Sequence, residues 1–157
     1  MKIICEVMRG EYVESRHIVY AIALDEAEKI IFSTGDPNYI TCIRSALKPF
    51  QAFAAIKHGA TSAAGFTEKE IALMCASHNG EEVHINTANN MLKKLGFDQT
   101  HYECGSHYPH NKETREEMRK LNIKATPLHN NCSGKHAGML SLAKHLNINP
   151  KGYIKWE

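Results

Sequence analysis

The sequence predicts an α+β protein in which antiparallel strands come first and a block of helices follows. Three apolar runs rich in β-branched residues open the chain, and turn-forming residues separate them. From Ala46 onward, apolar residues instead recur at the three- and four-residue spacing of amphipathic helices. Because strands and helices are segregated along the chain, an antiparallel sheet is favoured over an alternating parallel α/β fold.

The expected strands are short and end at turn-forming residues. They span residues 3–8, 18–24 and 29–32. Arg9-Gly10-Glu11 and Asp25-Glu26-Ala27-Glu28 have the composition of tight turns between antiparallel strands. Gly35-Asp36-Pro37-Asn38 closes this β section, because glycine and proline interrupt regular structure.

Five helices are expected after that point, two of them with clear end signals. Thr67 and Glu70 have the spacing of a capping box, in which each side chain accepts the other residue's backbone N–H. Gly96 suits the position just past a helix C-terminus. The expected helices are 46–58, a helix led by Thr67 into residues 71–74, 82–95, 111–121 and 135–146.

Length and composition limit the classes of function. The chain has 157 residues, which fits one domain, with 43% hydrophobic and 23% charged residues, as in ordinary globular proteins. A formal net charge of +2 and scattered basic residues give no footprint for nucleic acid or an acidic membrane. No run approaches the ~18 apolar residues of a membrane span, and residues 1–6 are too short for a signal peptide. We therefore expect a cytoplasmic protein.

The five cysteines are odd in number and widely spaced, and no two of them form a C-x-x-C motif. Free thiols in a reducing compartment are one interpretation, and a metal site built from some of them is the other. The segment 150–157 has the composition of a connection rather than of a capped helix or a polar tail. We therefore expect the chain to be part of a longer architecture.

Ser45 and Lys48 form the first candidate site, within Arg44-Ser45-Ala46-Leu47-Lys48-Pro49. With Ser45 as the N-cap of a helix, Lys48 would lie one turn away on the same face, and Pro49 would still fit. A serine hydroxyl is a weak nucleophile that a neighbouring neutral lysine can activate as a base. The alternative is a capping serine with a solvated lysine, and the pattern alone favours it.

Ser77-His78-Asn79 forms the second candidate site, on the connection between two expected helices. It has the Ser-x-Asn spacing that penicillin-recognising enzymes place beside their Ser-x-x-Lys pair, with histidine where aspartate is usual. The alternative is a polar turn with Asn79-Gly80 at its corner. Together with the first motif, the catalytic interpretation becomes competitive.

Cysteine, lysine and histidine gather in two further segments. Cys132, Lys135 and His136 can share one face at a helix start, which is compatible with metal ligation. Gly134-Lys135-His136 lacks the remaining residues of a phosphate-binding loop, so that function is rejected. Cys104 and His107 could supply two zinc ligands, but a closed site needs four. For both segments, structural roles are the alternative.

Taken in order, the blocks of this sequence resemble the rhizobial-type asparaginase II family. The matching blocks are 6–10, 13–17, 35–37, 44–52, 76–81, Cys104-Gly105 with His107 and Pro109, and 130–140. The resemblance implies hydrolysis of L-asparagine to L-aspartate and ammonia, on a fold similar to serine β-lactamases and glutaminases. It also implies a homodimer.

The resemblance implies roles for particular residues. Ser45 and Lys48 would form a Ser-Lys tandem, and Ser77 would pair with a second lysine from a C-terminal half. Zinc near the substrate would be held by Cys132, Lys135 and a cysteine further downstream. The residues that flank the two serines are assigned to substrate binding: Arg44, His78, Asn79 and Gly80.

Members of this family are considerably longer, so residues 1–157 would correspond to the N-terminal portion of a single asparaginase-like domain. Without the second lysine and the third zinc ligand, we expect weak or no activity, poor zinc affinity and an unpaired sheet edge. Two alternatives stay open. One is a non-catalytic fragment acting as an interaction module. The other is a small metal-binding protein using Cys104, His107, Cys132 and His136.

Overall fold

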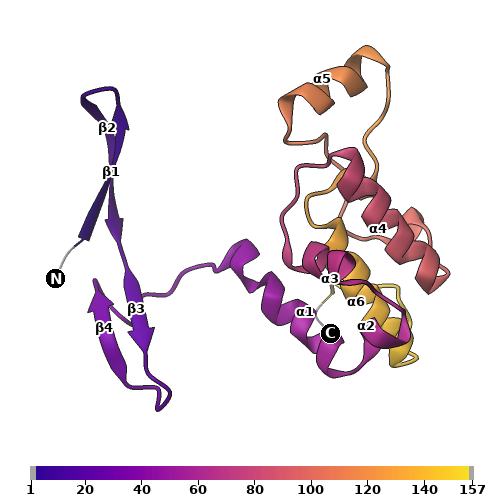
Figure 1. Cartoon of the computed structure of the whole chain (residues 1–157), viewed down its shortest axis with the longest axis horizontal. Coiled ribbons are helices and arrows are strands. Elements are labelled where there is room, and N and C mark those ends of the chain that lie inside the picture. Colours follow the sequence, from indigo (N-terminus) through magenta and orange to yellow (C-terminus); the bar gives the residue numbers. More distant parts are fainter. Residues whose placement is uncertain (1–2, 156–157) are drawn as a thin grey trace. The chain divides into compact units, whose positions relative to one another are not determined.

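A computed structural model describes residues 3–155 and confirms the α+β class. Within these residues, four strands in antiparallel pairs precede six α-helices and three short 3-10 helices. The chain divides into two compact units, Met1–Cys42 and Ile43–Glu157, which Figure 1 colours from indigo to yellow along the sequence. That both units belong to one domain stays a prediction. The expected connection at 150–157 includes residues 156 and 157, which lie outside the described part.

The first unit consists of two antiparallel hairpins. They are formed by β1 (Ile3–Arg9) with β2 (Tyr12–Val19), and by β3 (Ala21–Leu24) with β4 (Ile30–Thr34). The prediction of one strand over 18–24 is wrong, because Tyr20 separates β2 from β3 and stacks its ring on that of Tyr39. Residues 12–17 of β2 were not predicted as a strand, because four of these six residues, Glu14 to His17, are polar and leave no apolar run. Arg16 pairs across the hairpin with Glu6 at 2.7 Å.

Both expected turns of the first unit are present. Gly10 adopts a left-handed conformation with φ +60 at the β1–β2 turn, which glycine accepts without steric cost. In the β3–β4 turn, an Asp25 carboxylate oxygen accepts the N–H groups of Ala27 and Lys29, each at 2.9 Å. An aspartate side chain that binds the backbone of the following residues stabilises a turn locally.

The second unit is helical and contains every helix that the sequence predicts. Its elements are η1 (Arg44–Leu47), α1 (Lys48–Lys57), α2 (Ala60–Ala63), α3 (Glu68–Cys75), α4 (Glu82–Leu95), η2 (Gln99–His101), α5 (Lys112–Lys120), η3 (Pro127–His129) and α6 (Ser133–His145). The Thr67 capping box is confirmed, with Thr67 N donating to Glu70 Oε2 at 2.7 Å. Gly96 ends α4 with φ +69, also as expected. Within residues 3–155, the short α-helix α2 and the 3-10 helices η2 and η3 were not predicted.

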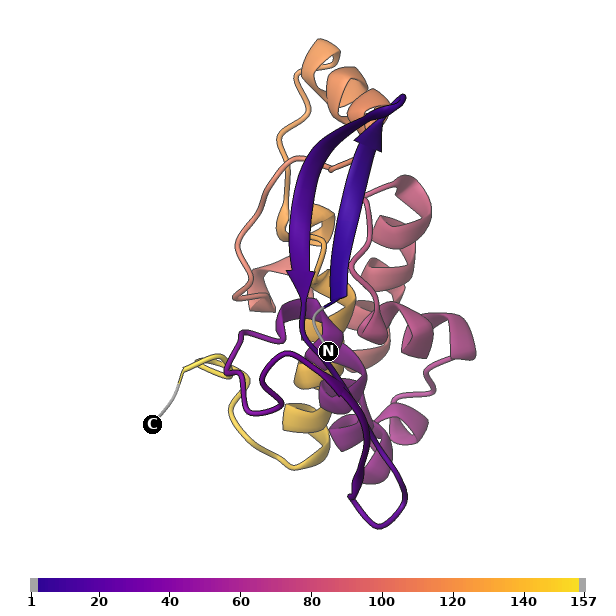
Figure 2. The same cartoon turned by 90° about the vertical axis from the view of Figure 1, so that its left-hand side faces the viewer.

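Helix α6 forms the centre of the second unit. It packs against α1, α2, α3 and α4, which surround it in Figures 1 and 2. Gly134 and Gly138 allow this approach, because a Cβ at Gly134 would collide with the Leu73 carbonyl and one at Gly138 with the Met74 side chain. In both views α5 stands apart from the other helices. The candidate site described below therefore lies at helices that pack closely against one another.

None of the helices within residues 3–155 combines the length and the apolar character that crossing a lipid bilayer demands.

Candidate functional site

Lys48 is the buried centre of a hydrogen-bonded cluster. Its side chain lies at the start of α1, and the residue is only 2% exposed. Nζ contacts Ser77 Oγ at 2.6 Å, the Ala76 carbonyl at 2.7 Å and the Asn131 carbonyl at 3.3 Å. A lysine ammonium carries three N–H donors, so each finds one acceptor. Burial of the amine is therefore compensated by a fixed set of partners, which also fixes its orientation.

Ser77 connects Lys48 to Ser45. Ser77 Oγ donates a hydrogen bond to Ser45 Oγ at 2.9 Å, while it contacts Lys48 Nζ on its other side. Among the described residues, no hydrogen bond joins Lys48 to Ser45 directly. The three predicted catalytic residues are therefore brought together, but in the order Lys48–Ser77–Ser45 and not as a direct Ser45–Lys48 pair.

Ser45 is held by an unusual backbone rather than by a helix cap. The prediction that Ser45 is an N-cap is wrong: it lies inside η1, and Leu47 is the N-cap of α1. Arg44 just before it has φ +50, a left-handed conformation that costs a non-glycine residue about 1–2 kcal/mol. The 3-10 turn begins there, so the chain turns tightly into α1 and presents Ser45 toward Ser77.

A cavity of about 320 Å³ opens beside this cluster. Ser45 and Lys48 line it together with the basic side chains of Arg44 and Lys135 and the thiol of Cys132. The positive charges of Arg44 and Lys135 beside one small cavity favour a ligand that carries a negative charge, such as a carboxylate. The cavity therefore joins the serine cluster to the start of α6.

Asn131 and His107 belong to the site, although sequence analysis gave neither of them a catalytic role. Asn131 N donates to His107 Nε2 at 3.1 Å, and His107 Nδ1 donates to the Tyr108 carbonyl at 2.9 Å. The imidazole thus binds the backbone N–H of the residue whose carbonyl accepts from Lys48. The Cys-x-x-His spacing indicated His107 as a candidate metal ligand and gave no sign of a role beside Lys48. Its support of Lys48 depends on long-range contacts that no local pattern reveals.

The predicted substrate-binding residues differ in exposure. Arg44 and Asn79 are exposed, whereas His78 and Gly80 are buried. His78 Nε2 lies 2.8 Å from Ser133 Oγ, and Nδ1 accepts the Gly80 N–H at 3.1 Å. Burial lowers the pKa of His78 to about 4, and neighbouring cationic groups add to the effect. Substrate contact by His78 stays a prediction, but both ring nitrogens already have protein partners.

The four-residue metal site is not formed. No group of three or more His, Cys, Asp or Glu side chains within residues 3–155 could hold a metal ion. His136 Nδ1 is bonded to the Tyr153 hydroxyl at 2.9 Å, and His107 to Asn131. Burial raises the pKa of the Cys104 thiol to about 11, which disfavours the thiolate that zinc needs. Cys104, His107, Cys132 and His136 therefore do not form a ready metal site among the described residues, and metal binding by them stays a prediction.

The two zinc donors that the family resemblance implies, Cys132 and Lys135, stay a prediction. Cys132 and Lys135 both line the cavity beside Ser45. Zinc in proteins usually has four ligands. All four are side chains in structural sites, and three are side chains in catalytic sites. The donors among the described residues do not complete such a site, so no catalytic step is derived through a metal.

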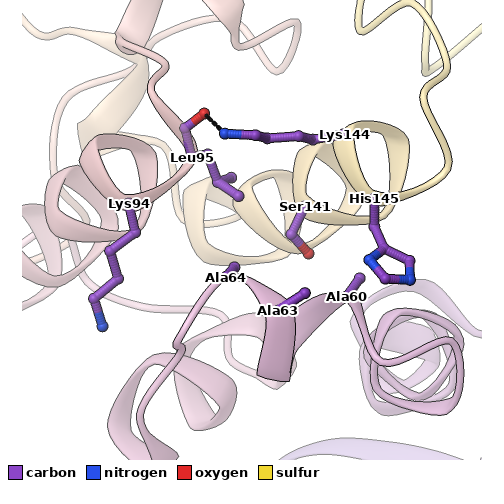
Figure 3. A pocket seen from close by; sticks show the side chains of 8 residues that line it. All are labelled: Ala60, Ala63, Ala64, Lys94, Leu95, Ser141, Lys144 and His145. Atoms are coloured by element: carbon purple, nitrogen blue, oxygen red, sulfur yellow. Dashed lines mark hydrogen bonds between the residues drawn. The ribbon is translucent and has the colours of Figure 1, made fainter.

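Another cavity, of about 220 Å³, lies between α2, α4 and α6 (Figure 3). Its lysines have structural roles. Lys144 Nζ donates to the Leu95 carbonyl at 2.6 Å, at the C-terminal end of α4, where a positive charge is favourable. Lys94 Nζ is bonded to Glu70 and to the Gly65 carbonyl, each at 2.7 Å. This cavity is apart from the serine cluster, which remains the candidate site.

Comparison with known proteins connects this site to a family. The family model described as L-asparaginase II matches residues 5–157, almost the whole chain. No curated protein sequence gives a significant match.

Proposed function

The chain belongs to the L-asparaginase II family, and on this premise we propose that it hydrolyses the side-chain amide of L-asparagine to L-aspartate and ammonia. Ser45 is the proposed nucleophile, Lys48 the base and Ser77 the group that relays the proton between them. An asparaginase-type amidohydrolase requires an activated nucleophile or water beside a pocket for an amino acid. The serine cluster supplies the nucleophile.

The observation that carries this proposal is the continuous contact from Lys48 Nζ through Ser77 Oγ to Ser45 Oγ, with distances of 2.6 and 2.9 Å. A neutral lysine has two N–H donors and one lone pair. The carbonyls of Ala76 and Asn131 can only accept, so they take the two N–H groups. The lone pair then faces Ser77 Oγ, as a base must. In this neutral form the Ser77 hydroxyl turns to donate to Nζ, and the Ser45 hydroxyl donates to Ser77 Oγ.

The proposed reaction has two stages. Ser45 Oγ attacks the amide carbon, while its proton passes to Ser77 and the Ser77 proton passes to Lys48. As the tetrahedral intermediate collapses, the C–N bond breaks, the proton returns to the leaving nitrogen, and ammonia departs. Water then attacks the Ser45 ester, the same relay moves its proton, and aspartate is released while Ser45 recovers its hydrogen.

The basic groups at the cavity support the proposed substrate. L-Asparagine carries an α-carboxylate, which Arg44 can neutralise at the cavity, and Lys135 as well when it holds no zinc. Asn79 is exposed on the connection that carries Ser77 and offers an amide for further hydrogen bonds. The Gly80 N–H donates to His78 Nδ1 and so stabilises the same connection.

The proposal includes zinc binding and the rate at which these residues hydrolyse asparagine. Cys132 and Lys135 are proposed as two zinc donors, and the third ligand implied by the resemblance would come from outside the 157 residues. The second lysine that would pair with Ser77 would come from there as well. Because neither group is among these residues, we propose that they alone turn over asparagine slowly, and that a homodimer is the assembled form.

A second candidate function, association without catalysis, is favoured by the first unit. Its two hairpins expose large apolar side chains, among them Ile4 at 52%, Ile18 at 52% and Ile31 at 66%. Two-stranded sheets are marginally stable alone and gain stability by pairing or packing. An interaction module would show this association without depending on Ser45.

Ammonia release from L-asparagine by the purified chain tests the proposal. We expect slow release that the Ser45→Ala variant abolishes while its circular dichroism spectrum stays that of the parent chain. Equal release by both proteins would exclude Ser45 as the nucleophile. No release at all, even with zinc added, would exclude autonomous catalysis and leave association as the function to test by sedimentation.

A further inference from the structure

Two segments far apart in the sequence are joined behind the serine cluster. The first, 76–80, carries Ser77, and the second, 130–133, leads into α6. The His78 backbone N–H donates to the Asn131 carbonyl at 3.2 Å, and the His78 ring reaches Ser133 Oγ at 2.8 Å. The Asn131 carbonyl also accepts from Lys48. Any displacement between these segments therefore changes the surroundings of the amine.

His78 has a single hydrogen-bonded form in this setting. Because Gly80 donates its N–H to Nδ1 at 3.1 Å, that nitrogen has no hydrogen, and Nε2 carries one and donates it to Ser133 Oγ. The residue is 4% exposed. Burial, and then the electrostatic effect of His84, Lys48, His107 and His129, lower the pKa of His78 to about 4. The ring is therefore neutral near pH 7 and keeps one donor and one acceptor.

We propose that His78 is a positioning residue, whose bond to Ser133 fixes the separation between Ser77 and the start of α6. This inference rests on the proposed function, and it replaces substrate contact with a role behind the site. The imidazole spans the space between the two segments and touches no ligand. It sets where Ser77 meets Lys48 on one side and where Cys132 and Lys135 border the cavity on the other.

The surroundings of both partners restrict any compensating movement. Ser133 is fully buried at 0% exposure, and its backbone N–H is held by the Asn130 carbonyl at 2.9 Å. The His84 ring stacks on the His78 ring with centroids 5.0 Å apart and an interplanar angle of 14°. A tightly packed interior adjusts poorly when such a bond is removed. Loss of the bond should therefore move the relay rather than leave it intact.

Two substitutions at His78 separate its two hydrogen bonds. In His78→Gln the amide nitrogen can reach the position of Nε2, so the bond to Ser133 is kept and the one to Gly80 is lost. In His78→Asn the amide oxygen can replace Nδ1, so the Gly80 bond is kept and the one to Ser133 is lost. Ser133→Ala removes the same bond from its other end, and the His78→Asn, Ser133→Ala double variant completes the set.

Steady-state kinetics and hydrogen exchange are measured on the full chain for all four variants. We expect kcat for L-asparagine to fall about 10–100-fold in His78→Asn and in Ser133→Ala, with KM within about twofold of the parent value. His78→Gln should retain most of kcat, and the double variant should be no worse than the poorer single one. Amide exchange should accelerate in both 76–80 and 130–136, again except in His78→Gln.

The results can overturn the inference separately from the proposed function. A raised KM with kcat unchanged in His78→Asn would mean that the ring contacts substrate. Losses that multiply in the double variant, or exchange that changes in only one segment, would mean that the bond does not couple them. If the parent chain releases no ammonia, the proposed function fails, and the exchange of the two segments still decides whether His78 joins them.

Discussion

The Oγ atoms of Ser45 and Ser77 lie 2.9 Å apart, although 32 positions separate the two residues in the chain. Lys48 contacts Ser77 and not Ser45, so the two residues of the Ser-x-x-Lys motif are connected through a third residue. Ser77 therefore lies between two residues that the sequence pattern paired directly. This order of contacts leads to predictions that separate the relay from the nucleophile.

Replacing Ser77 with alanine should remove proton relay without removing the nucleophile. We expect kcat for L-asparagine to fall about 10²–10⁴-fold, as when a general base loses contact with its target, while KM stays close to the parent value. The measurement is ammonia release under saturating substrate. Ser106→Ala is the control, because Ser106 is an exposed serine in another loop. An unchanged kcat in Ser77→Ala would mean that Lys48 reaches Ser45 without it.

Replacing Lys48 with methionine should reduce stability as well as activity. The Ala76 carbonyl would lose its donor in a buried site, and an unsatisfied group of this kind costs about 1–3 kcal/mol, while the Asn131 carbonyl would keep only the His78 N–H. Urea denaturation should show a lower free energy of unfolding, and ammonia release should be lost. Lys57→Met on the exposed end of the same helix controls for the loss of a charge. Equal stability of the two variants would contradict the role of Lys48 as a buried donor.

Gly80→Ala should destabilise the connection that carries Ser77. Gly80 has φ +76, and a Cβ there would lie 3.1 Å from both the His129 carbonyl oxygen and Pro109 Cβ. Gly59 has the same φ of +76, but a Cβ added there would meet no atom within 4 Å. Gly59→Ala therefore measures the backbone cost alone. We expect Gly80→Ala to lose about 1–3 kcal/mol more by urea denaturation, because of crowding, and equal losses would contradict that reason.

As the pH falls, the helical unit should begin to lose stability at a higher pH than protonation of its carboxylates alone would cause. Burial is the main cause that lowers the pKa of both His78 and His136 to about 4 from 6.5. Between these values the unfolded chain binds more protons than the folded one, so stability rises with pH. Each histidine then contributes a loss of up to about 1.4 kcal/mol per pH unit as the pH falls from 6.5 toward 4.

Urea denaturation at pH 5 and pH 7 measures this dependence. His136→Gln should reduce the difference between the two pH values, whereas His58→Gln at an exposed position should leave it as in the parent chain. If His136→Gln leaves the difference intact, His136 is not the source of that part of the acid sensitivity.

Zinc retained by the chain should depend on Cys132 and not on Cys104. Cys132 lines the cavity, whereas burial raises the pKa of the Cys104 thiol to about 11. We expect the metal content after zinc loading and desalting to be low, and to be abolished in Cys132→Ser but unchanged in Cys104→Ser. Mass spectrometry of the metal content measures this, and stoichiometric zinc that persists in Cys132→Ser would exclude the proposed donor.

Local signals explain why much of the helical unit could be predicted. The Thr67 capping box and Gly96 act within a few residues, so the sequence alone indicates where α3 begins and α4 ends. The strands were harder, because the polar residues of β2 lie on an exposed hairpin and do not form an apolar run. The break at Tyr20 depends on its stacking against Tyr39, which is distant in sequence.

The candidate site was only partly accessible to sequence analysis. Ser45, Lys48 and Ser77 could be named from their spacing, but the order of their contacts follows from the packing of α1 against α3 and α6. The supporting roles of Asn131, His107 and Ser133 could not be predicted. They act through hydrogen bonds between segments more than 20 residues apart, as the 24-residue separation of His107 from Asn131 shows.

The central claim is that Ser45 forms a covalent ester with the substrate. Rapid acid quenching of the chain mixed with L-asparagine, followed by peptide mass analysis, tests it most directly. We predict one aspartyl group on the peptide that contains Ser45, and none in Ser45→Ala. Ammonia release with no modified Ser45 peptide at any quench time, or an aspartyl group found on Ser77 instead, would contradict the account.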